Sequence, residues 1–170
     1  MIKLSCTAIV ATLALLGASP AIAADTMVVR HANTPPGLIL QGVTVAAGAK
    51  MLYLSGQLAA PIDPAKKIAP ADLTIADFGD TRTQTISVFT KIKALLAAQG
   101  FAMQDIIKLT VFVAGDPKLG GKMDFAGMND AFKMFFGTAE NPNTVARSTV
   151  QVAALAGPAF LVEIEATAAK

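Results

Sequence analysis

The stretch TIADFGDTRTQTISVFTKIKALLAAQGFAMQDIIKLTVFV, residues 74–113, decides the fold because its hydrophobic period changes partway along. Up to Gln99, apolar side chains recur every three or four residues, as on one face of an amphipathic helix (Phe78, Ile86, Phe89, Ile92 and Leu96). Gly100 then provides a helix stop. The run from Ile106 to Val113 is rich in β-branched residues. The stretch therefore predicts a helix over residues 74–99 that is followed by a buried strand.

The rest of the chain shows the same two periods on either side of this unit. A second stripe lies at helical spacing, and we expect it to be core that docks on a sheet rather than a ligand site (Phe125, Met128, Phe132, Phe135 and Phe136). Branched apolar runs between proline and glycine turns predict strands over residues 28–31, 38–45, 51–58, 145–152 and 160–167. The order β-β-β-α-β-α-β-β predicts an α+β fold, with two helices on one face of a mixed or antiparallel sheet.

Residues 1–23 have the organisation of a secretory signal. One lysine precedes an uncharged apolar run, and Ala21 and Ala23 provide the small side chains of a signal-peptidase site. A membrane anchor is disfavoured, because Pro20 interrupts the run before the about 20 apolar residues that a spanning helix needs. We therefore predict cleavage after Ala23 and a single mature domain over residues 24–170. Its expected location is periplasmic or secreted, without membrane attachment.

Composition and charge disfavour several classes of partner and cofactor. The formal charge is +2 and no Lys/Arg cluster exceeds Lys66-Lys67, so the cationic surface that a nucleic-acid partner requires is missing. The single cysteine, Cys6, lies in the predicted signal, which removes disulfides and thiolate metal sites from the mature chain. His31 is the one histidine, and the acidic residues are scattered. With no nucleotide-binding or metal-binding motif in the sequence, we expect neither a metal nor another cofactor.

The last two predicted strands carry the candidate chemistry. Strand alternation puts Arg147 and Thr149 on one face of the first strand, and Glu163 and Glu165 on one face of the second. A hairpin centred on Ala156 would pair Thr149 with Glu163 and Arg147 with Glu165, making Glu163 a diagonal neighbour of Arg147. One interpretation is an ordinary cross-strand ion pair. The other is a carboxylate receptor, in which the Arg147 fork binds a ligand and Glu163 orients or deprotonates a water. The residues alone leave both interpretations open.

Four segments resemble the RidA (YjgF/YER057c/UK114) family, in the same order and with the same spacing. They are Leu52-Tyr53-Leu54-Ser55-Gly56-Gln57, Ile107-Lys108-Leu109-Thr110-Val111-Phe112-Val113, Met128-Asn129-Asp130-Ala131-Phe132, and Ala146-Arg147-Ser148 followed by Val162-Glu163-Ile164-Glu165-Ala166. The resemblance extends from about Gln41 to Ala168. It implies a chorismate-mutase-like α+β fold and a homotrimer with ligand clefts between its subunits.

The resemblance also implies roles for individual residues. Arg147 would bind the carboxylate of a 2-enamine or 2-imine acid, which water hydrolyses to a 2-keto acid and ammonia. Glu163 matches the family's water-orienting glutamate, which makes Arg147 and Glu163 the implied catalytic pair. Ser55 and Asn129 match positions that line or support the cleft, and the backbone near Thr149 would meet the bound water or carbonyl. The implied partner is thus a small imino or keto acid.

Two positions depart from the pattern of the family's enamine deaminases. Alignment on Gln41-Gly42-Val43 puts Ile39 where those enzymes carry a tyrosine, and Thr149 stands where they often have a cysteine. Ile39 cannot donate the hydrogen bond of a phenol. The resemblance thus implies an intact anion-binding half of the site beside an altered catalytic half.

Two functions stay open on this basis. The first is an enamine/imine deaminase. The second is a non-catalytic periplasmic trimer, which binds small carboxylates or acts as a chaperone-like holdase. A ribonuclease ranks last, because the chain is close to neutral and has a single histidine.

Overall fold

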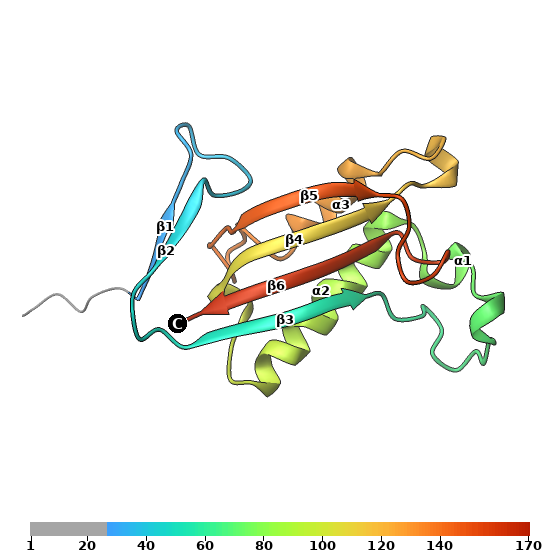
Figure 1. The fold of residues 1–170 in the computed structure, drawn as a ribbon, viewed down its shortest axis with the longest axis horizontal. Helices are drawn as coiled ribbons and strands as arrows, with labels where there is room; N and C mark the ends of the chain where they lie inside the picture. Colours follow the sequence, from blue (N-terminus) through green and yellow to red (C-terminus); the bar gives the residue numbers. More distant parts are fainter. Residues whose placement is uncertain (1–26) are drawn as a thin grey trace, which may run out of the picture.

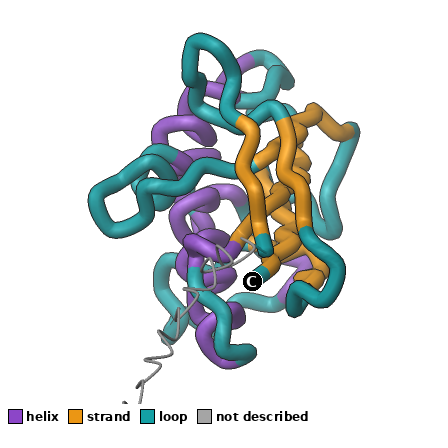
Figure 2. The backbone as a smooth tube through the Cα atoms, turned by 90° about the vertical axis from the view of Figure 1, so that its left-hand side faces the viewer, coloured by secondary structure: helices purple, strands orange, loops and turns teal. Residues whose placement is uncertain are grey.

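The computed structural model describes residues 27–170, so the predicted signal over residues 1–23 lies outside the described part. The strands are β1 (Val28–His31), β2 (Gly42–Val45), β3 (Met51–Leu58), β4 (Ile106–Ala114), β5 (Ala146–Val152) and β6 (Val162–Ala169). The helices are α1 (Ile75–Phe78), α2 (Thr81–Ala98) and α3 (Phe125–Phe132), with short 3-10 turns at Pro70–Asp72, Met103–Asp105 and Pro117–Leu119. Figure 1 shows a four-stranded sheet with α2 and α3 on its far side, and Figure 2 shows the two layers from another direction. The predicted α+β class is confirmed.

Strand β4 lies inside this sheet, whose strand order is β3-β6-β4-β5. It pairs antiparallel with β6 along one edge and parallel with β5 along the other, so the sheet is mixed. Its side chains alternate between the two faces: Leu109, Val111 and Val113 are fully buried, whereas Lys108 and Phe112 point the other way and are only partly buried. This alternation separates a helix-covered face of the sheet from an uncovered one.

The predicted hairpin between the last two strands is wrong, because β4 separates β5 from β6. The connection after β5 instead crosses the end of β4. There the buried amide of Gln84 in α2 donates to the Ala159 carbonyl at 3.0 Å and accepts from the Leu161 N–H at 2.9 Å. Thr149 therefore pairs with Val111 of β4 rather than with Glu163. Strand alternation contains no information about which strand lies next to β5, so the sequence could not reveal this crossing.

The helix predicted over residues 74–99 is divided into α1 and α2 at Gly79. Gly79 adopts φ 88°, a left-handed conformation that other residues rarely take. Asp80 is the N-cap residue of α2, because its carboxylate accepts a hydrogen bond from the Thr83 N–H at 2.8 Å. Within residues 27–170, no helix has both the length and the hydropathy that crossing a bilayer demands.

Strands β1 and β2 form a small sheet of their own beside the main sheet (Figure 1). The strand predicted over residues 38–45 begins only at Gly42, because the residues before it form a loop that packs on the body of the domain. In that loop the buried Leu40 donates its N–H to the Val145 carbonyl at 2.9 Å. This hydrogen bond attaches the loop between β1 and β2 to the start of β5.

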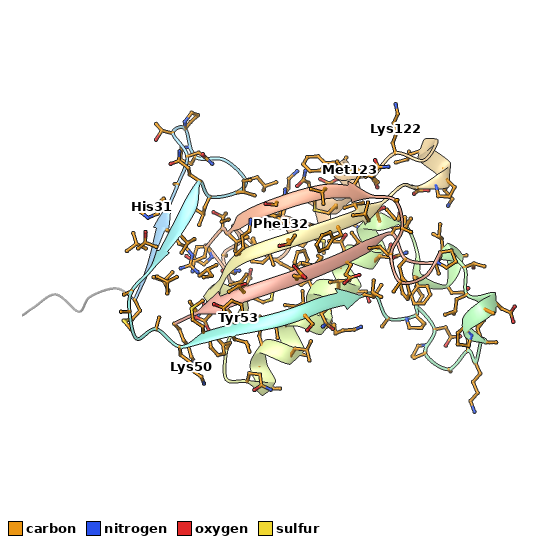
Figure 3. The ribbon with its side chains drawn as sticks, viewed as in Figure 1. His31, Lys50, Tyr53, Lys122, Met123 and Phe132 are labelled. Atoms are coloured by element: carbon orange, nitrogen blue, oxygen red, sulfur yellow. The ribbon has the colours of Figure 1, made fainter. Side chains whose placement is uncertain are left out.

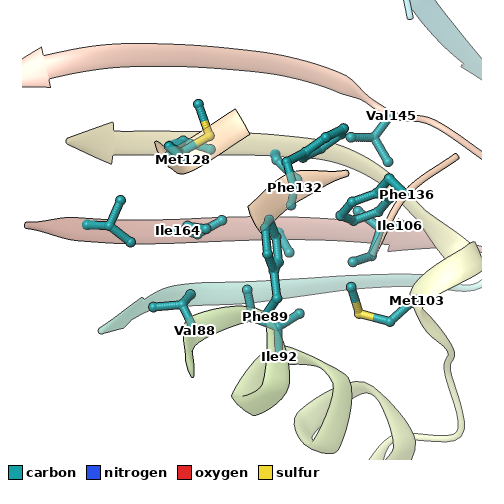
Figure 4. Close-up of a cluster of buried hydrophobic side chains, with 14 of the residues drawn as sticks. Val88, Phe89, Ile92, Met103, Ile106, Met128, Phe132, Phe136, Val145 and Ile164 are labelled. Atoms are coloured by element: carbon teal, nitrogen blue, oxygen red, sulfur yellow. The ribbon is translucent and has the colours of Figure 1, made fainter. Parts of the chain in front are cut away.

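Aromatic side chains fill the space between the sheet and its helices. The ring centroid of Phe89 in α2 lies 6.3 Å from that of Phe132, 5.5 Å from that of Phe136 and 5.1 Å from that of Phe135. Figure 4 shows Phe89 and Phe132 facing each other across this core. The stripe Phe125, Met128, Phe132, Phe135 and Phe136 is predicted to be core, and this is confirmed for Met128, Phe132 and Phe136, with Phe135 partly buried against them. It is wrong for Phe125, which is 44% exposed because α3 turns it outward.

We expect Phe89→Ala to lower the free energy of unfolding by about 3–5 kcal/mol, since truncation leaves a cavity that close-packed rings cannot fill. Urea denaturation followed by circular dichroism measures this change. Phe125→Ala is the matched control, because its ring is partly in solvent already, and it should change stability by less than about 1 kcal/mol. Equal losses in the two variants would contradict the assignment of the core.

Candidate anion-binding site

Arg147 lies at the open edge of the sheet, on the face that the helices cover. It pairs with Leu109, a core-facing residue of β4, and its side chain meets α3. The guanidinium donates to Asn129 Oδ1 at 2.7 Å and contacts Met128 Sδ at 3.7 Å. Its central carbon lies 4.5 Å from the centroid of the Phe132 ring. Cation–π contact and an amide acceptor thus hold the cation in one orientation.

The charge of Arg147 has no opposite partner among the described residues. The ion pairs there join Lys66 to Asp77 and Lys133 to Asp130, and neither includes Arg147. Partial burial of the guanidinium lowers the pKa of Arg147, because the cation has lost part of its hydration. A guanidinium has five N–H donors, and those not directed at Asn129 or Met128 can meet a planar anion. The site is therefore suited to a carboxylate.

Thr149 is a second polar residue of β5 on the helix-covered face. It lies two residues after Arg147 and therefore on the same face of β5. Its hydroxyl Oγ1 is buried and forms no hydrogen bond with any described residue. Buried hydroxyl groups are nearly always hydrogen bonded in folded proteins, so the unpaired Thr149 Oγ1 is an exception, and the structure leaves almost no accessible surface on it.

Glu163 does not lie beside Arg147, which corrects the predicted diagonal contact. It pairs with Phe112 and points to the uncovered face, between the fully buried Val162 and Ile164 of the same strand. Arg147 lies on the other face and beyond β4. Arg147 and Glu163, the predicted catalytic pair, therefore do not meet within one chain.

Glu163 instead lies opposite the part of β3 that contains Ser55 and Gly56. The pairing of β3 with β6 shifts register between Leu54 and Gln57, and Gly56 sits in this irregularity. A Cβ atom on Gly56 would lie 1.9 Å from Glu163 Oε1, so only glycine leaves room for the carboxylate in this position. Ser55 is the exposed neighbour of Gly56. Glu163, Ser55 and Gly56 thus form one half-site, and Arg147, Asn129 and Thr149 form the other.

Ile39 lies in the loop between β1 and β2. It packs partly buried against the core, and the next residue, Leu40, is bonded to Val145 two positions before Arg147. The phenol expected from the family pattern is therefore replaced by an apolar side chain beside the start of β5. His31 lies elsewhere, on β1, where its Nε2 is 2.8 Å from Thr44 Oγ1.

Sequence reasoning missed three residues that shape the two half-sites. Met128 and Phe132 were assigned to the core stripe, yet both also contact the Arg147 guanidinium. Gly56 belongs to a resembling segment, but the sequence gives no sign that it makes room for Glu163. The sequence did contain one signal for Met128 and Phe132. Helical spacing puts them on the same helix as Asn129, the residue that was expected to support the cleft. Among residues 27–170, no three His, Cys, Asp or Glu side chains lie close enough together to hold a metal ion.

The fold and the arginine without an ion-pair partner among residues 27–170 define an α+β protein with a candidate anion-binding site at the edge of its sheet. Residues 41–170 match the family described as Endoribonuclease L-PSP. A RutC family protein of Pyrococcus horikoshii is 34% identical over 138 residues, which cover 81% of this chain and 93% of that protein. The 2-iminobutanoate/2-iminopropanoate deaminase of Escherichia coli K12 is 32% identical over 145 residues, which cover 85% and 97%.

Solved structures agree with these sequence matches. The crystal structure of Escherichia coli TdcF with bound serine has a TM-score of 0.53 and 32% identity, covering 83% of this chain and 93% of that one. The Rid family protein YyfB of Yersinia pestis has a TM-score of 0.59 and 26% identity, covering 78% and 87%. The chain therefore belongs to the Endoribonuclease L-PSP family, that is, to the RidA (YjgF/YER057c/UK114) proteins that its sequence resembles.

We expect Arg147→Ala to weaken binding of 2-oxobutanoate by about 10- to 100-fold, because charge-assisted hydrogen bonds to the carboxylate are lost. Isothermal titration calorimetry measures the affinity. Arg82→Ala is the matched control, since Arg82 is exposed and its guanidinium hydrogen bonds to the sulfur of Met134, at 3.5 Å, far from Arg147 in the sequence. Unchanged affinity in Arg147→Ala, or an equal loss in Arg82→Ala, would rule out Arg147 as the carboxylate receptor.

Proposed function

We propose that the protein is a deaminase of the RidA type, which hydrolyses reactive 2-imino acids to 2-keto acids and ammonia. One observation carries this proposal: the half-buried Arg147 guanidinium is held by Asn129 and lacks a carboxylate partner among the described residues. Two relatives support it. One is named a 2-iminobutanoate/2-iminopropanoate deaminase, and the other was crystallised with serine, an amino acid that carries the same carboxylate group.

In the proposed reaction, Arg147 binds the substrate carboxylate and so positions the adjacent imine carbon. Glu163 removes a proton from water as the water oxygen bonds to that carbon, and passes the proton to the imine nitrogen. The second proton of the same water follows as the carbon–nitrogen bond breaks. Ammonia leaves, and the oxygen remains as the carbonyl of the 2-keto acid. The backbone near Thr149 meets the bound water or this carbonyl.

We further propose that each site forms between two copies of the chain, with Arg147 from one copy and Glu163 from the next. Support comes from the separation of the half-sites: β4 lies between their strands, and the two side chains leave opposite faces of the sheet. A hydrolytic site needs the carboxylate anchor and the proton acceptor on the same small substrate. A homotrimer satisfies this requirement, because a closed ring of head-to-tail contacts repeats the same site at every interface.

The uncovered face of the sheet also supports association of several copies. Tyr53 of β3 is 72% exposed and Val150 of β5 is 44% exposed, and both point to the face that lacks helices. Figure 3 shows Tyr53 on β3, at the edge of the sheet opposite β5. A sheet normally buries a hydrophobic face against another layer. A second copy of the chain can provide that layer.

Arg147→Ala and Glu163→Gln should each abolish ammonia release from enzymatically generated 2-imino acids. When equal amounts of the two inactive chains are unfolded and refolded together, activity should return to about a quarter of the wild-type level. This is the fraction of interfaces in a mixed ring that combine an intact Arg147 with an intact Glu163. A coupled assay for the 2-keto acid measures the rate.

The controls distinguish the remaining functions. Refolding each variant alone should restore nothing, and sedimentation should show trimers throughout. No recovery in the mixture would refute a site shared between copies. A wild-type protein that binds 2-oxobutanoate through Arg147 but accelerates no imine hydrolysis would establish the non-catalytic alternative, which the Ile39 and Thr149 substitutions favour.

We also propose that the mature chain begins at Ala24 and works in the periplasm or outside the cell. The support is the pattern of residues 1–23, in which Ala21 and Ala23 precede the expected cleavage site. Expression of the full chain in a Gram-negative bacterium should give a periplasmic protein whose mass, by mass spectrometry, corresponds to residues 24–170. Ala23→Phe should block cleavage, because the peptidase accepts small residues there. An uncleaved wild-type chain in the cytoplasm would reject export.

A further inference from the structure

One side of α2 is hydrogen bonded to the main chain where β3 ends and where β6 begins. Figure 1 shows this helix behind the two strands. The bonds come from three side chains that helical spacing puts on one face, namely Gln84, Ser87 and Lys91. We call these three residues the α2 polar stripe. Strands β3 and β6 carry the half-site of Glu163, so the stripe is bonded to the part of the sheet that holds this carboxylate.

Gln84 is the fully buried member of the stripe, and its amide uses both of its N–H donors. Its Nε2 donates to the Gly79 carbonyl and to the Ala159 carbonyl, each at 3.0 Å. Its Oε1 accepts from the Leu161 N–H at 2.9 Å. A buried amide is stable only while these bonds are made, which leaves it a single orientation. Gln84 therefore holds the entry to β6 in a fixed place relative to α2.

The backbone around Glu163 is held at two points. Two residues before it, Leu161 bonds to the stripe through its N–H and accepts from the Ala114 N–H of β4 at 2.9 Å. Opposite it, Leu58 is its pairing partner in β3, and the Leu58 carbonyl accepts from Lys91 Nζ at 2.6 Å. Glu163 thus lies between two segments of main chain that are both bonded to α2.

The position of the Glu163 carboxylate leaves little room for error. A Cβ atom on Gly56 would lie 1.9 Å from Glu163 Oε1 and 2.8 Å from the carboxyl carbon, so the carboxylate is packed directly against the backbone of β3. A shift of β6 relative to β3 would therefore move the carboxylate. A displacement of about 1 Å in a reacting group can cost about 100-fold in rate.

The half-site of Arg147 is held by a different helix. The guanidinium is supported by Asn129, Met128 and Phe132, which all belong to α3. The hydrogen bonds that the stripe makes within residues 27–170 go to the main chain at the ends of α1, β3 and β6, and none goes to α3 or β5. Loss of the stripe should thus disturb one half-site and spare the other.

We propose that the α2 polar stripe, with Gln84 as its main member, positions Glu163 for proton transfer from water. This inference rests on the proposed deaminase, because that function makes Glu163 the proton acceptor. Gln84 touches no reacting group and acts through the backbone of β6, so it is a positioning residue. Its removal should affect the chemical step, while binding of the substrate carboxylate stays with Arg147.

Steady-state kinetics with enzymatically generated 2-imino acids, together with calorimetry of 2-oxobutanoate, test the proposal. Gln84→Met removes the amide bonds at a similar side-chain volume. It should lower kcat about 10- to 100-fold and leave KM and the affinity for 2-oxobutanoate within about twofold of the wild type. Unchanged kcat, or a loss of 2-oxobutanoate affinity as large as the loss of kcat, would overturn the positioning role.

Thr85→Val is the matched control for the loss of a buried polar group. Thr85 is also fully buried on α2, but its hydroxyl donates to the Thr81 carbonyl of the same helix at 2.7 Å. Its loss should cost stability and leave kcat within about twofold of the wild type. An equal loss of kcat in Thr85→Val and Gln84→Met would show that the effect is one of general stability, and would overturn the proposal.

Lys91→Met tests the other end of the stripe without disturbing the core, because Lys91 is only partly buried. It should lower kcat by about three- to tenfold at unchanged 2-oxobutanoate affinity, and it carries the test if Gln84→Met does not fold. Lys93→Met is its control, since Lys93 is exposed on the same helix and lies outside the stripe. Equal kcat values in the two lysine variants would contradict the proposal.

Refolding of mixed chains assigns the defect to one half-site. Gln84→Met refolded with an equal amount of Arg147→Ala should recover about a quarter of the wild-type activity, because one interface in four combines an intact Arg147 with an intact Gln84 and Glu163. Refolded with Glu163→Gln, it should recover no more than Gln84→Met alone shows. Recovery in both mixtures would overturn the proposal, as would recovery in neither while the Arg147→Ala and Glu163→Gln chains restore one another.

These outcomes separate this inference from the proposed function. A wild-type protein that hydrolyses no imine refutes the deaminase, and the positioning role fails with it. An active wild type with an equally active Gln84→Met refutes the positioning role alone.

Discussion

The inner position of β4 is the constraint on which the arrangement of this protein depends. Both edges of β4 are hydrogen bonded, to β6 on one side and to β5 on the other, and one of its faces is fully buried. A strand with so many branched apolar residues is most stable in such a place. Its insertion between β5 and β6 puts Arg147 at an edge and Glu163 on the opposite face. The two halves of the proposed site are separated within one chain for this reason.

The aromatic core has a second role beyond stability. Phe132 packs against Phe89 on one side and lies under the Arg147 guanidinium on the other. The same ring therefore anchors α3 to α2 and supports the cation that is proposed to bind substrate. Asn129, on the same helix, completes the support with its amide oxygen. A change that moves α3 would thus disturb the anion-binding half-site together with the core.

Recognition at the proposed site depends on charge. At Arg147, a partly desolvated cation that is held by Asn129 favours a small anion. Export to the periplasm would expose this site to small molecules from outside the cell. The enamines that cytosolic enzymes release would be less available there, and this fits the altered positions Ile39 and Thr149.

The sequence by itself determined the α+β class, most of the strands, the core stripe of α3 and the candidate residues Arg147, Asn129 and Glu163. The class, the strands and the positions of Arg147 and Glu163 follow from hydrophobic period and strand alternation, which are local properties of a few neighbouring residues. Asn129 became a candidate only through the resemblance of its segment to the family. Only the tertiary structure decided that Gly79 divides the predicted helix, that β4 separates β5 from β6, and that Gly56 leaves room for Glu163. These features depend on contacts between residues far apart in the chain, such as the bonds of Gln84 to the loop before β6. No local pattern encodes them, because strand order is set by which packing buries the most apolar surface while satisfying every buried polar group.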